Sequence, residues 1–99
     1  MGIEVVVEDE RGTKLASLED PTNILHRVLP PQEDSGFQCL NRVDWYGDTT
    51  FNRHQIPDVR RELSLLATTR KGVEEVEMIR QLEVMATKAE AGPHFFLKF

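Results

Sequence analysis

Apolar and polar residues alternate along residues 3–8, with the period of two that is typical of a half-buried β-strand. The buried face would comprise Ile3, Val5 and Val7, and the opposite face Glu4, Val6 and Glu8. Residues 9–12 are turn-forming, and Gly12 supplies a position that tolerates positive φ. Residues 13–18 then return as a second strand. The start of the chain therefore predicts a β-hairpin.

Apolar residues spaced by three and four predict two helices in the middle of the chain. Asp20 and Pro21 suit the start of the first helix, as cap and first helical residue, and Pro30 ends it. Pro57 begins the second helix, and Gly72 ends it. The expected buried positions are Ile24, Leu25, Val28 and Leu29 in the first helix and Val59, Leu63 and Leu66 in the second.

Residues 73–89 predict the longest helix, with glutamates in its first turns where the helix dipole favours negative charge. Its expected buried positions are Val76, Ile79, Leu82, Met85, Ala86 and Ala89. The opposite stripe comprises Glu74, Glu77, Gln81, Val84 and Lys88. This stripe is either ordinary solvated surface or a contact for a basic partner, with Val84 as the apolar contact and Glu77 as the steering charge.

Residues 37–43 and 49–51 contain strand-forming residues. The Tyr46-Gly47-Asp48 sequence between them predicts a hairpin turn with Gly47 at positive φ. Residues 94–99 predict a closing strand, and we expect it to pair within the sheet because its alternate residues are large and apolar.

The resulting element order is β-β-α-β-β-α-α-β. This order predicts an α+β fold, a two-layer sandwich in which helices cover one face of a mainly antiparallel sheet. A chain of 99 residues is expected to form a single domain, residues 1–99.

Composition and charge narrow the classes of partner. The net charge of -5 disfavours nucleic acid and anionic membrane surfaces. No apolar run reaches the roughly 18 residues that a membrane span needs. Cys39 is the only cysteine, which fits a reducing compartment. We therefore expect a cytoplasmic protein with a protein partner.

The stretch richest in chemical groups is DWYGDTTFNRHQ, residues 44–55. Its oxygen and nitrogen donors are Asp44, Asp48, Asn52 and His54. These groups could converge on a divalent metal with a further ligand from His26 or His94, although their spacing matches no established ligand pattern and a solvated turn is the alternative. Trp45 and Tyr46 are either an apolar cap over the sheet edge or a contact anchor at a protein interface.

Two other groups of residues carry alternative interpretations. Cys39 could form a thiol triad with His54 and Asp44, or it could be a small buried apolar residue. The arginines that could hold an anion are Arg53, Arg60 and Arg61, and the acids near enough to pair with them are Asp58 and Glu62. Glycine-rich phosphate-binding loops are absent from the sequence. The sequence therefore supports no catalytic residue, metal site or cofactor.

Four segments carry a resemblance to known proteins: VVVEDERG in the first hairpin, EDP followed by LHRVLP at residues 19–30, VDWYGDTTFNRHQ, and the closing PHFFLKF. They resemble a group of small bacterial proteins, mainly from actinobacteria, that have no assigned function. The YGDT-FN core is the most specific part, and Trp45 stands where a proline is expected. The resemblance implies a compact bacterial cytoplasmic domain and assigns no site residues.

Two functions are compatible with these observations. The first is a non-enzymatic, acidic protein-interaction module, such as an immunity or accessory protein encoded beside its partner. Its candidate binding residues are Trp45, Tyr46, Asp48, Asn52, His54, Glu77 and Val84. The second is a small-molecule or metal-binding domain, with or without enzymatic activity, centred on residues 44–54. Because no convergent catalytic set is visible, the first function is favoured.

Overall fold

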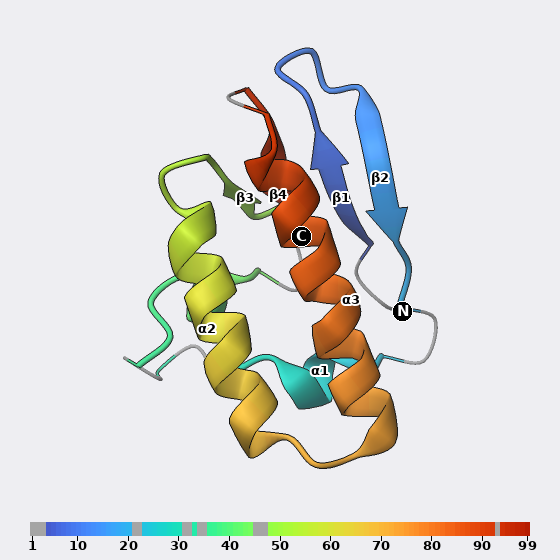
Figure 1. Ribbon diagram of the computed structural model, residues 1–99, viewed down its shortest axis with the longest axis vertical. Coiled ribbons are helices and arrows are strands. Elements are labelled where there is room, and N and C mark those ends of the chain that lie inside the picture. Colours follow the sequence, from blue (N-terminus) through green and yellow to red (C-terminus); the bar gives the residue numbers. More distant parts are fainter. Residues whose placement is uncertain (1–3, 21–22, 31–32, 34–35, 45–47, 93) are drawn as a thin grey trace.

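Four antiparallel strands form the sheet, and helices cover one of its faces (Figure 1). The computed structural model describes residues 4–20, 23–30, 33, 36–44, 48–92 and 94–99. The strands are β1 (Val5–Glu8), β2 (Lys14–Leu18), β3 (Thr50–Phe51) and β4 (Phe96–Lys98), in the spatial order β2-β1-β4-β3. The helices are α1 (Leu25–Val28), the 3-10 helix η1 (Leu40–Arg42), α2 (Ile56–Thr69) and α3 (Val73–Glu90). The predicted α+β sandwich is confirmed.

The core lies between the helices and one face of the sheet. Val5 and Val7 of β1 are fully buried there, whereas Val6 points to the opposite face, since side chains alternate along a strand. α3 packs on β1, β2 and β4, and α2 packs beside α3 (Figure 1). β4 pairs with both β1 and β3, as expected for an apolar closing strand. The rings of Phe51 and Phe99 meet edge to face, with centroids 5.8 Å apart.

The first hairpin forms as predicted. Gly12 has φ 79°, a conformation that glycine adopts at little cost. The side-chain oxygen Oδ1 of Asp9 accepts hydrogen bonds from the backbone N–H groups of Arg11 and Thr13, each at 2.9 Å. The Thr13 bond is the main reason why the pKa of Asp9 is lowered. The ladder between β1 and β2 carries a register shift between Val7 and Glu8.

The two long helices also form where the sequence predicts them, but one expected core position of α3 is wrong. Val76 is 44% exposed, and Met78 is buried in its place. At 100° per residue, Met78 lies about 40° from the buried Leu82 around the helix axis, whereas Val76 lies about 120° from it. Val76 therefore falls outside the face that α3 turns towards the core.

Asp20 anchors the first helix, though that helix is shorter than its apolar stripe suggests. The regular part is only α1, Leu25–Val28, and its N-cap is Ile24, so the prediction of Asp20 as the cap is wrong. Pro21, predicted as the first helical residue, lies outside the described residues. The two carboxylate oxygens of Asp20 accept hydrogen bonds from the backbone N–H groups of Ile24 at 2.8 Å and Leu25 at 2.9 Å. Asp20 is itself buried, so this carboxylate replaces water as the partner of the first free amides.

The strand predicted over residues 37–43 is wrong. This segment contains turns and the 3-10 helix η1. The carboxylate of Glu62, from α2, accepts hydrogen bonds from the backbone N–H of Cys39 at 3.1 Å and of Leu40 at 2.9 Å. These amides bind a side chain instead of a neighbouring strand, so no sheet ladder forms here.

Candidate functional site

The region around residues 44–54 is built from local turns in the part that the structure describes. The backbone N–H of Asp44 donates to Thr49 Oγ1 at 2.8 Å. Asn52 Oδ1 accepts from the backbone N–H groups of His54 and Gln55, at 2.9 and 3.2 Å, and so leads the chain into α2. Asn52 thus acts as a turn residue, and His54 is exposed.

Trp45, Tyr46 and Gly47 lie outside the described residues, as does the turn predicted at residues 46–48. The hairpin that would flank this turn is not present, because residues 37–43 form no strand. The interpretations of Trp45 and Tyr46 as a cap or as a contact anchor stay predictions.

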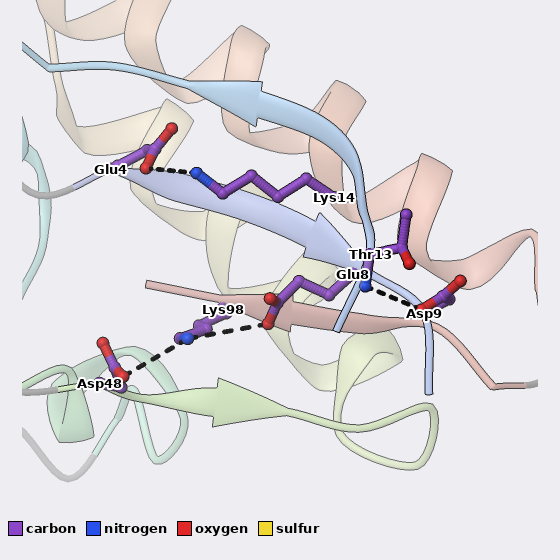
Figure 2. Close-up of polar contacts among 7 residues, drawn as sticks. All are labelled: Glu4, Glu8, Asp9, Thr13, Lys14, Asp48 and Lys98. Carbon is purple, nitrogen blue, oxygen red and sulfur yellow. Dashed lines mark hydrogen bonds and ion pairs between the residues drawn. The ribbon is translucent and has the colours of Figure 1, made fainter. Parts of the chain in front are cut away.

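Asp48 contributes to an ion-pair network on the sheet face that the helices leave uncovered (Figure 2). Lys98 of β4 places its Nζ 3.4 Å from Asp48 Oδ2 and 3.8 Å from Glu8 Oε1. On the same face, Lys14 pairs with Glu4 at 3.1 Å. These contacts tie the loop before β3 to the central strands, so Asp48 already has a cationic partner.

No three His, Cys, Asp or Glu side chains among the described residues gather closely enough to hold a metal ion. His26, His54 and His94 are all exposed, and His94 has its Nδ1 3.9 Å from Glu10 Oε2. The metal site centred on residues 44–54 therefore gains no support from these positions.

Glu62 is a structurally important residue that the sequence did not single out. It was expected to pair with an arginine, and this expectation is wrong because the side chain is fully buried against the amides of η1. Arg61 instead lies 3.8 Å from Asp58. Glu62 lies three positions after Val59 and four before Leu66, and this spacing was the sequence pattern that could have indicated burial.

Cys39 lies beside this carboxylate and is half-buried. Burial raises the pKa of the Cys39 thiol, and the negative charges of Glu62 and Asp58 raise it further. A raised pKa keeps the sulfur protonated, whereas a nucleophile must be a thiolate. The environment of Cys39 therefore favours a structural role over the thiol triad.

A groove of about 600 Å³ runs between α2 and α3. It is lined by Pro57, Arg60, Arg61 and Ser64 of α2, by Arg80, Glu83, Val84, Thr87, Lys88 and Glu90 of α3, and by no other described residue. Four cationic side chains thus face two carboxylates in a chain whose net charge is -5. Val84 is 43% exposed, which confirms that it is an apolar residue on the surface of the helix.

Two of the four cations in the groove are already paired. Arg60 lies 3.0 Å from Glu90. Arg80 donates from Nε to Glu77 at 2.9 Å, and this bond, with a weaker one from Gln81, lowers the pKa of Glu77 to about 2. Lys88 has no ion pair among the described residues, and Arg61 only the long contact to Asp58.

The stripe of α3 that was expected to be acidic is therefore offset by cations. Glu77 is exposed and paired with Arg80, and Glu74 lies 3.2 Å from Arg27. The surroundings of Val84 are basic instead, because the helix packing brings Arg60 and Arg61 to its side. Sequence spacing on α3 alone could not show this.

Searches against protein-family models, curated proteins and solved structures found no match to this chain. No helix in the described part of the chain combines the length and apolar character needed to cross a membrane. Function is therefore argued from the surfaces themselves.

Proposed function

We propose that this protein is a non-enzymatic protein-interaction module that binds its partner through the groove between α2 and α3. The observation that carries this proposal is the placement of the exposed Val84 among cationic side chains in that groove. Protein interfaces usually place apolar contacts at their centre and polar groups at their rim. An immunity or accessory protein encoded beside its partner would have this character.

The partner segment that suits the groove carries an apolar side chain for Val84 and carboxylates for Arg61 and Lys88. These two cations have the weakest internal pairing in the groove, so their charge is available to a partner. Complementary charge accelerates association and selects the partner more than it adds affinity. The overall negative charge of the chain would at the same time repel other acidic proteins.

Selection from a random peptide display library tests the proposal. The wild-type protein is expected to enrich peptides with several carboxylates around an apolar residue. The Arg61→Glu, Lys88→Glu double variant should lose these peptides. The matched control is Arg53→Glu, Lys71→Glu, which makes the same charge change at exposed positions outside the groove and should keep them. Enrichment of basic peptides, or equal loss in both variants, would contradict the proposed site.

A further inference from the structure

β2 is an edge strand with an unusually exposed surface. It pairs with β1 on one side, and no strand in the described part of the chain pairs with it on the other (Figure 1). Leu15 is 47% exposed, and Ala16 and Leu18 are only partly buried although they pack against the core. An edge strand offers unpaired backbone N–H and C=O groups to a further strand. The core is thus incompletely covered along β2.

A hollow of about 200 Å³ lies beside this edge, between β2 and α3. It is lined by Ser17, Leu18, Arg80, Gln81, Val84 and Met85. A strand added next to β2 would direct every second side chain to the helix-covered face, where this hollow lies. Backbone pairing and side-chain burial would therefore occur together, which is how β-strand addition gains both affinity and specificity.

The sequence of β2 is self-complementary when a second copy runs antiparallel to it. Lys14 stands at one end of the strand, where it also pairs with Glu4 of its own chain, and the exposed Glu19 follows the other end. An antiparallel copy therefore brings the basic end of each strand to the acidic end of its partner. With Ser17 of the two copies opposite each other, the small Ala16 faces the larger Leu18 on the side of α3. The same register brings Lys14 opposite Asp20 and Leu15 opposite Glu19, so no like charges lie directly opposite one another.

We propose that β2 is a homodimer interface, in which two copies of the chain pair their β2 strands antiparallel about Ser17 and form a continuous eight-stranded sheet. The register shift between Val7 and Glu8 lies near the Lys14 end, so the regular ladder is available at residues 16–18. The shared apolar seam covers Leu18 and Val84 of both copies. Val84 also lines the groove between α2 and α3, so the dimer would cover part of that groove.

Concentration-dependent molecular mass, measured by light scattering on the full chain, tests the dimer. Wild type is expected to be dimeric at high concentration. Ser17→Glu places like charges opposite each other at the two-fold axis and should raise the dimer dissociation constant about tenfold or more. Ser64→Glu makes the same change at an exposed serine of α2 and should leave it unchanged. A wild type that stays monomeric up to millimolar concentration would overturn the proposal, as would a dimer that is insensitive to Ser17→Glu.

A cysteine crosslink tests the register. In a Cys39→Ser background, Ser17→Cys should form a disulfide-linked dimer under mild oxidation, because facing residues of antiparallel strands have Cα atoms about 4.5–5.5 Å apart, within disulfide range. Ser64→Cys should stay monomeric in the same background. Circular dichroism checks that each variant is folded. If Ser17→Cys failed to crosslink while wild type dimerises, the interface would lie elsewhere. If β2 instead paired only with a peptide of another protein, wild type would stay monomeric.

Discussion

The two edge strands of the sheet, β2 and β3, differ in length and in what lies beside them. β2 has five residues and leaves Leu15 47% exposed. β3 has two residues, and its Phe51 is buried. The chain just before β3 is held from both sides, because Thr49 pairs through its backbone with Phe99 and its Oγ1 accepts the N–H of Asp44.

This difference shows that two edges of one sheet can differ in how they are protected from pairing with a further strand. A very short strand offers too few backbone groups to template pairing, so the β3 edge needs little further protection. The β2 edge is long enough to pair, and a register shift interrupts its ladder near the Lys14 end. The predictions below perturb first the β3 side and then the β2 side of the molecule.

The largest effect is expected from Glu62→Ala. The substitution leaves the N–H groups of the half-buried Cys39 and the buried Leu40 without their partner, which should lower the free energy of unfolding by about 2–4 kcal/mol. Chemical denaturation measures the loss. Glu83→Ala, on α3, is the control and should change stability by less than about 0.5 kcal/mol. Equal stability of Glu62→Ala and wild type would show that the segment before β3 is held by other contacts.

Asp20→Ala, in the segment that follows β2, should have the next largest effect. It removes the carboxylate that accepts the N–H groups of Ile24 and Leu25, a loss of about 1–2 kcal/mol. The neighbouring Glu19→Ala is exposed and should be near neutral for the stability of the monomer. Thermal unfolding compares the two at low protein concentration, and similar melting temperatures would exclude the proposed anchoring role of Asp20.

Gly12→Ala tests the turn that positions β2. No atom lies within 4 Å of the added Cβ, so the expected loss of about 1 kcal/mol comes from φ 79° alone. Gly12→Asn is the control, because asparagine enters the left-handed region at less cost than alanine. Denaturation curves for the two variants should separate. Coincident curves would mean that the positive φ is not the cause of the loss.

The smallest effect concerns Glu77, which pairs with Arg80 of the hollow next to β2. Its pKa is lowered to about 2 in the folded chain, chiefly by the hydrogen bond from Arg80. A lowered folded pKa contributes stability above the usual glutamate pKa, and this contribution is lost as pH falls towards about 2. Because the pair is exposed, the effect on unfolding should be slight. An NMR titration of the side-chain carboxyl should show the midpoint rising in Arg80→Gln, and an unchanged midpoint would exclude this cause.

Periodic burial explains why much of the fold was predictable from the sequence. The alternation in β1 and the spacing in α2 and α3 each describe one buried face, and neighbouring residues suffice to recognise it. The segment before β3 is different, since Glu62 lies 23 positions from Cys39 and 22 from Leu40. No pattern among neighbouring residues can predict a contact between positions that far apart in the sequence.

The candidate site likewise has a part that the sequence predicted and a part that it did not. The exposure of Val84 follows from its position on α3, and it was predicted. The cations around Val84 come from two helices whose packing the sequence does not describe, so the basic character of the groove was not foreseen. Which strands lie at the edges of the sheet is equally a non-local property. The strand order β2-β1-β4-β3 decides which strands are left unpaired on one side.

Amide hydrogen exchange at low and high protein concentration tests the comparison between the edges most directly. The account predicts that protection of amides within Ala16–Leu18 increases with concentration, as β2 pairs with a second copy, while Thr50 and Phe51 of β3 keep the same exchange rates. Rates in β2 that do not depend on concentration, or added protection in β3 instead, would contradict it.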